Sequence, residues 1–220
     1  MNFDRTHCTG FNIGIGMIGP QRTGKTTTAG HVAEFFKIPK VEANLYSVFT
    51  RLGYTPKEQY DLDTRIKIQS ALLEHLSDVL HGGFALKYIE DSAEEMGALQ
   101  NGFVIDRTPL DLAAYMMADV VRDCTVQQAD KIEEFVRRCV SLHKKFFKTT
   151  VLFPAIPVGK DLEKSATINA AYMQHINLLC FSLMHQNNIQ FIELRTQAEF
   201  ERVAVILKNT VGDAAYKVHL

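Results

Sequence analysis

The glycine-rich segment GPQRTGKT, residues 19–26, has residue types and a spacing that could bind phosphate. It matches the pattern G-x-x-x-x-G-K-[ST], whose glycines let backbone N–H groups converge on an anion at a helix amino terminus. In this pattern Lys25 reaches the β- and γ-phosphates, and the hydroxyl of Thr26 is a ligand of Mg²⁺. An incidental glycine-rich turn is the alternative, but it would not require the apolar segment before the motif and the helix-forming segment after it. We therefore expect ATP and Mg²⁺ at this loop. The residues expected to contact the nucleotide are Gly19, Arg22, Thr23, Gly24, Lys25, Thr26 and Thr27.

A second polar pair follows another apolar segment, FVID at residues 103–106. This segment is typical of a buried strand that ends in a carboxylate. Because ligands of open α/β sheets bind beyond the carboxyl ends of the strands, Asp106 could hold Mg²⁺, and the planar guanidinium of Arg107 could bind phosphate oxygens. Thr108 and Pro109 then begin a helix that carries Asp111, a candidate substrate-binding residue. The alternative is an ordinary helix start with Arg107 on the surface.

Strands alternate with helices along the chain, which predicts a mostly parallel sheet covered on both faces. Apolar runs predict strands at residues 11–18, 38–41, 103–106, 149–153 and 189–194. Helical periodicity and start signals predict helices at residues 25–36, 44–52, 57–80, 84–99, 109–121, 125–147, 168–186 and 197–209, with Pro56 at the opening turn of the third. Residues 154–167 are predicted to form a surface loop.

Size and charge narrow the class of protein. A chain of 220 residues favours one domain, 1–220, and the formal net charge of -1 argues against a protein that coats nucleic acid. We expect a cytoplasmic protein, since no apolar run is long enough to span a bilayer and the amino terminus lacks an export signal. The four cysteines lack metal or redox spacing and are expected to be reduced thiols.

The order of these motifs resembles the P-loop nucleoside and nucleotide kinase superfamily, including small, often phage-encoded, AAA-type ATPases with nucleotide-kinase-like sequences. The resemblance is carried by GPQRTGKTT, DLDTRIKIQSALLEHL, FVIDRTPLDLAAYM and IELRTQAEFERV, which together order almost the whole chain. It implies a three-layer αβα fold with five parallel strands in the order 2-3-1-4-5. It also implies that residues 154–167 form a lid and that Arg195 lies near the adenine.

The resemblance further implies where the acceptor binds. Nucleoside kinases use a carboxylate near the end of the second strand as general base, and Glu42 has that place, although a solvated glutamate is an equal alternative. Arg51, Arg65 and Gln69 could bind an acceptor phosphate or a base edge, or could lie on the surface. Four aromatic residues could stack on a base, but such residues more often belong to a core. They are Tyr46, Phe49, Tyr54 and Tyr115.

One departure from the family concerns the lid. Kinases of this kind have lid arginines, whereas this segment offers only Lys160 and Lys164 as catalytic cations.

Three hypotheses about function follow from these motifs. The leading one is transfer of phosphate from ATP to a nucleoside monophosphate, a nucleoside or a related small molecule. The second is a kinase that acts on a modified base or hydroxyl in DNA, and the third is a regulatory ATPase without a phosphorylated product. The sequence leaves open a homodimer.

Overall fold

The structure is a computed structural model that describes residues 13–56, 58–83, 102–120, 123–156 and 169–211. Its centre is a five-stranded parallel sheet in the order β2-β3-β1-β4-β5. The strands are β1 (Ile13–Ile18), β2 (Lys40–Val41), β3 (Gly102–Ile105), β4 (Thr149–Leu152) and β5 (Phe191–Glu193). The predicted fold class and strand order are confirmed.

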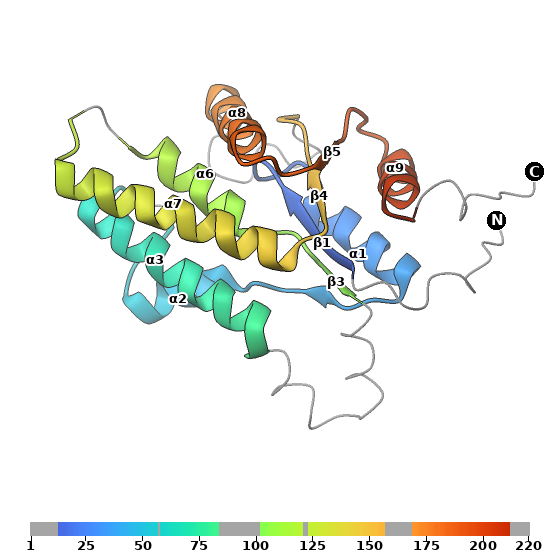
Figure 1. Ribbon diagram of the computed structural model, residues 1–220, viewed down its shortest axis with the longest axis horizontal. Helices are drawn as coiled ribbons and strands as arrows, with labels where there is room; N and C mark the ends of the chain where they lie inside the picture. Colours follow the sequence, from blue (N-terminus) through green and yellow to red (C-terminus); the bar gives the residue numbers. More distant parts are fainter. Residues whose placement is uncertain (1–12, 57, 84–101, 121–122, 157–168, 212–220) are drawn as a thin grey trace, which may run out of the picture.

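Helices cover both faces of this sheet, so the fold has three layers (Figure 1). One core joins the sheet to α2 (Leu45–Leu52), α3 (Leu62–Asp78), α6 (Pro109–Ala118), α7 (Val126–Phe146) and α8 (Ala170–Gln186). A second core joins the other face to α1 (Lys25–Phe36) and α9 (Glu199–Val211). A π-helical turn, η1 (Val79–Gly83), follows α3. No helix among the described residues is long and apolar enough to cross a membrane.

Local sequence signals explain most element boundaries. Thr108 and Thr125 begin α6 and α7 with capping boxes, in which the threonine side chain and the residue three positions later satisfy each other's backbone N–H groups. The predicted start of α3 near Pro56 is wrong. The helix starts at Leu62, because the Asp61 side chain accepts a hydrogen bond from the Thr64 N–H and caps it. The helix predicted at residues 84–99 lies outside the described residues.

Glycines let β1 lie very close to α7 and to the start of α6. A Cβ added at Gly14 would lie 2.0 Å from the Phe146 carbonyl oxygen, and one at Gly16 would lie 2.8 Å from the side chains of Phe147 and Thr108. No larger residue fits at either position without displacing backbone or packed side chains. Because β1 pairs with β3, the loop after β1 lies next to the loop after β3, and the candidate site lies where these loops meet.

Candidate active site

The phosphate loop leaves β1 through a backbone conformation that only glycine adopts easily. Gly19 has φ +133°, and a Cβ there would lie 2.7 Å from the Phe153 carbonyl oxygen. Gly24, the N-cap of α1, is left-handed with φ 88°, and so is Arg22 with φ 62°. The loop therefore curves around the amino terminus of α1, where N–H groups and the helix dipole favour an anion.

Lys25 lies inside this curve, with only 5% of its surface exposed. Its Nζ donates hydrogen bonds to the carbonyl oxygens of Gly19, at 2.7 Å, and Pro20, at 2.5 Å. Burial, followed by the nearby charge of Arg107, lowers the pKa of Lys25 from 10.5 to about 8. An anion bound at the loop would stabilise the charged ammonium.

Thr26 and Asp106 lie next to each other, as the sequence predicts for a shared metal. The Thr26 hydroxyl donates to Oδ2 of Asp106 at 2.5 Å. One hydroxyl and one carboxylate are the hard oxygen ligands that Mg²⁺ prefers, and Mg²⁺ at nucleotide sites commonly takes few protein ligands beside phosphates and water. The residues present therefore fit this ion.

Asp111 lines the larger of the two pockets described below, but its side chain is buried and bonded to backbone. Its Oδ1 accepts a hydrogen bond from the Gly19 N–H at 3.1 Å, and Oδ2 accepts one from the Thr108 N–H at 2.8 Å. Burial raises the pKa of this carboxyl, while Lys25 and Arg107 oppose the shift. Asp111 thus ties the phosphate loop to the start of α6.

Two pockets adjoin the phosphate loop on the side of β3 and β2. The smaller pocket, of about 330 Å³, includes Thr26, Glu42, Asp106 and Arg107 in its lining. The larger pocket, of about 560 Å³, lies among α2, α3, α6 and α8 and also contacts Gln21 of the loop. Leu45, Tyr46 and Arg107 line both. The two pockets therefore adjoin each other, and together we call them the cleft.

Aromatic rings line much of the larger pocket. They belong to Tyr46, Phe49, Tyr60, Tyr115 and Tyr172. Arg107 lies over the Tyr115 ring, with Cζ 5.9 Å from the ring centroid. Tyr54 does not line the pocket but packs edge-on against Tyr60, with centroids 5.1 Å apart. A volume of this size and apolar lining suit a flat ring system.

The predicted acceptor residues divide into two groups. Glu42, Arg65, Gln69, Arg107 and Asp111 line the cleft. Glu42 is exposed and lies 3.8 Å from Lys40. Arg51 is exposed in the last turn of α2 and lines neither pocket. Arg195 is also exposed and pairs with Glu193 at 2.9 Å, while Lys160 and Lys164 lie outside the described residues.

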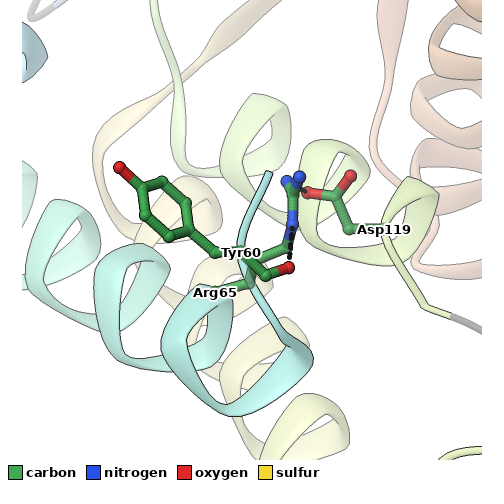
Figure 2. A network of polar contacts seen from close by, with 3 residues as sticks. All are labelled: Tyr60, Arg65 and Asp119. Carbon is green, nitrogen blue, oxygen red and sulfur yellow. Dashed lines mark hydrogen bonds and ion pairs between the residues drawn. The ribbon is translucent and has the colours of Figure 1, made fainter. Parts of the chain in front are cut away.

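Figure 2 shows a polar network at the edge of the larger pocket that the sequence did not reveal. Arg65 Nε donates to the Tyr60 carbonyl oxygen at 3.3 Å, and Nη1 forms an ion pair with Asp119. Asp119 follows the last residue of α6 and is four residues after Tyr115, so both lie on one face at the end of this helix. This spacing could have indicated that Asp119 lies near the pocket. Tyr172 lies on α8, and no sequence pattern around it indicates its position in the pocket.

The fold is similar to that of solved structures, two of which are kinases. NadR in complex with NR matches 94% of this chain and 54% of that chain, with 12% identity and a TM-score of 0.63, so this chain spans about half the length of NadR. Deoxyadenosine kinase from M. mycoides with bound dCTP matches 90% of this chain and 98% of that chain, with 14% identity and a TM-score of 0.57.

Thymidylate kinase from Ehrlichia chaffeensis matches 89% of this chain and 99% of that chain, with 13% identity and a TM-score of 0.53. At these identities the likeness shows a shared fold, and it confirms the predicted structural resemblance to the P-loop kinase superfamily. No protein-family model matches the sequence. A comparison with curated proteins also gives no match.

Proposed function

We propose that this protein is an ATP- and Mg²⁺-dependent kinase whose acceptor is a nucleoside or a nucleotide, with a nucleoside favoured. The observation that carries the proposal is the position of the Thr26–Asp106 pair, whose pocket adjoins the aromatic pocket and shares Arg107 with it. A donor bound at the loop would have its terminal phosphate at the junction of the two pockets. An acceptor ring in the larger pocket would then present a hydroxyl to that phosphate.

The donor half of the mechanism rests on the loop residues. Backbone N–H groups and Lys25 would hold the donor phosphates, and Thr26 and Asp106 would hold Mg²⁺. Bound Mg²⁺ would neutralise charge on the phosphates. Arg107, which lines both pockets, would stabilise the negative charge of the phosphoryl group as it moves between donor and acceptor.

Glu42 is our candidate general base. It lines the smaller pocket together with Thr26 and Asp106, so it lies on the acceptor side of the metal-binding pair. Its carboxylate is exposed and lies 3.8 Å from Nζ of Lys40. A base must approach the acceptor hydroxyl to roughly 3 Å, and an exposed side chain at this edge can do so when a substrate binds.

The larger pocket has the features needed to bind a nucleobase. Its tyrosine and phenylalanine rings can stack on a base. Gln69 lines it, and its Oε1 is buried without a hydrogen-bond partner among the described residues. A buried amide oxygen of this kind needs a donor, and the exocyclic amine of a base could supply one.

The charges of the cleft favour a nucleoside over a nucleotide acceptor. Among the described residues, the cations that line the two pockets are Lys40, Arg65 and Arg107. Lys40 faces Glu42, and Arg65 is paired with Asp119. Arg107 follows Asp106 and is assigned to the transferred phosphoryl group. No cation in the described lining is therefore left to neutralise an acceptor phosphate, whose charge would be costly to desolvate.

The test is to incubate the protein with γ-labelled ATP, Mg²⁺ and separate panels of nucleosides, nucleoside monophosphates and DNA, and to identify the labelled product. We expect a labelled nucleoside monophosphate. Label in a diphosphate would keep the kinase but overturn the preference for nucleosides. Label in DNA would identify the acceptor as a polymer, and label only in inorganic phosphate would contradict a kinase and indicate an ATPase.

A further inference from the structure

The guanidinium of Arg202 is an unusual group to find inside this fold. Arg202 lies on α9 and is only 2% exposed, which makes it one of the largest fully buried side chains described. Among the described residues, no carboxylate forms an ion pair with it, and its Nη2 has no hydrogen-bond partner. Glu199 is close enough for its charge to favour the charged guanidinium, but it makes no direct ion pair. A buried charge without a direct ion pair is costly, so packing alone is a poor reason for an arginine at this position.

The contacts of Arg202 join three segments that are distant in the sequence. Nη1 donates a hydrogen bond to the carbonyl oxygen of Thr23 in the phosphate loop, at 2.7 Å. Nε donates to the carbonyl oxygen of Thr196, in the loop between β5 and α9, at 2.9 Å. The guanidinium carbon lies 5.5 Å from the ring centroid of Phe153, directly after β4. One planar group therefore fixes the phosphate loop relative to the loop after β5.

The loop after β5 lies on the side of the phosphate loop where the donor base would extend. Both pockets are lined from the β2 and β3 side, which the acceptor would occupy. The sheet order places β4 and β5 on the opposite side of β1. With its phosphates at residues 19–26 and the acceptor on the β2 and β3 side, a donor nucleotide would have its base directed towards β4 and β5. Thr196 lies in the loop that follows the carboxyl end of β5, on this same side.

We propose that Arg202 is a positioning residue that couples recognition of the donor base to the shape of the phosphate loop. The inference rests on the proposed function, because it requires a nucleotide donor. Contact of a base with the loop of residues 194–198 orders the Thr196 carbonyl, and through Arg202 this orders the Thr23 carbonyl. Coupling of this kind is reciprocal, so a ligand at the phosphate loop also orders the loop after β5.

The first experiment compares two ligands that share a triphosphate, of which only ATP has a base. The dissociation constants of ATP and of inorganic tripolyphosphate, each with Mg²⁺, are measured by calorimetry for the wild type and for R202K. Lysine keeps the charge but lacks the planar fork that reaches two carbonyl oxygens. We expect the affinity for ATP to fall by about tenfold and that for tripolyphosphate by less than about threefold, within the usual range of coupling between sites.

The matched control is I206V, which removes one buried methyl group a helical turn further along α9 and leaves both hydrogen bonds of Arg202 in place. It should lower the melting temperature and leave the ratio of the two dissociation constants unchanged. An R202K variant that folds and loses equal affinity for both donors would overturn the coupling. If neither donor binds the wild type, the proposed function fails instead.

A second measurement needs no variant of Arg202. Amide hydrogen exchange of the wild-type protein is followed with and without tripolyphosphate and Mg²⁺. Because tripolyphosphate has no base, slower exchange in residues 194–198 would have to be transmitted from the phosphate loop, and this is the result we expect. Protection confined to residues 19–28 would contradict the proposal even if R202K failed to fold.

Discussion

Asp111, in the first turn of α6, accepts a hydrogen bond at Oδ1 from the backbone N–H of Gly19, 92 positions earlier in the chain. Its other oxygen accepts hydrogen bonds from the N–H and hydroxyl of Thr108, at 2.8 and 3.1 Å. The carboxylate is buried near Lys25 and Arg107, whose charges favour its ionised form. Asp111 therefore positions the phosphate loop and also balances two cations of the site.

The first prediction concerns D111N. The amide keeps the shape of the side chain, but its NH₂ group must face the Thr108 donors or the Gly19 N–H, which leaves a buried donor without an acceptor. We expect the free energy of unfolding to fall by about 1–3 kcal/mol, the usual cost of such a group. ATP should also bind several-fold more weakly, because the loop loses its anchor. Denaturant unfolding and calorimetry measure the two effects.

The control for D111N is D119N. Asp119 lies directly after α6, at the opposite end of this helix from the phosphate loop. D119N should leave ATP binding unchanged. If D111N and D119N bound ATP as tightly as the wild type, Asp111 would have no role in positioning the loop.

The contacts of Asp111 illustrate which part of the candidate site could be predicted from the sequence. The loop of residues 19–26 and the carboxylate after β3 follow local patterns, since glycine conformations and strand ends are fixed by nearby residues. The sequence predicted Asp111 as a substrate-binding residue, and it does line the larger pocket, but its role in positioning the phosphate loop was not predicted. Its hydrogen bond from the Gly19 N–H depends on β1 and β3 being neighbours, and this pairing is a property of the sheet.

The larger pocket was harder to predict for the same reason. Its lining comes from α2, α3, α6 and α8, and Tyr172 or Asp119 acquires a role only when these helices pack together. Arg202 is a similar case, because an arginine in a helix usually indicates an exposed face. Only the packing of α9 against α1 brings it to Thr23.

The second prediction follows from the pKa of Lys25. Burial lowers this pKa to about 8, whereas bound phosphate favours the charged form. At pH 8.5 most free protein would hold a neutral Lys25, so ATP binding should take up roughly half a proton or more. Calorimetry in two buffers of different ionisation enthalpy measures this uptake. The affinity for ATP should fall as the pH rises above about 8.

The pKa of Lys25 also has a consequence for stability. Because the pKa in the folded state lies below 10.5, the folded state binds fewer protons than the unfolded state between about pH 8 and 10.5. The contribution of Lys25 to the free energy of unfolding should therefore rise with pH across this window. In K25M both this rise and the proton uptake should disappear. Equal proton uptake by K25M and the wild type would assign the titration to another group.

The third prediction tests the pair formed by Thr26 and Asp106. T26V removes the hydroxyl but keeps the branched shape, whereas T26S keeps the hydroxyl. If Thr26 helps to hold Mg²⁺, the Mg²⁺ concentration needed for half-maximal activity should rise at least about tenfold in T26V, the scale seen when supporting groups of metal sites are lost. T26S should stay near the wild type. Similar Mg²⁺ dependence in both variants would remove Thr26 from the metal site.

The fourth prediction concerns the ion pair between Arg65 and Asp119, which lies in the lining of the larger pocket. Lysine at position 65 keeps the charge but cannot contact both Asp119 and the Tyr60 carbonyl oxygen. If this pair shapes the acceptor pocket, R65K should raise KM for the acceptor by roughly tenfold, about 1.4 kcal/mol, with little change in KM for ATP. The exposed R137K on α7 should leave both constants unchanged.

A double-mutant cycle separates the pair from its individual charges. D119N alone leaves the half-buried Arg65 unpaired, so it should raise KM for the acceptor as R65K does. Because both substitutions break one contact, R65K/D119N should be no worse than the poorer single variant, and the energies should not add. Strict additivity would show that the two residues act independently, and an unchanged KM for the acceptor in all three variants would place the acceptor outside the larger pocket.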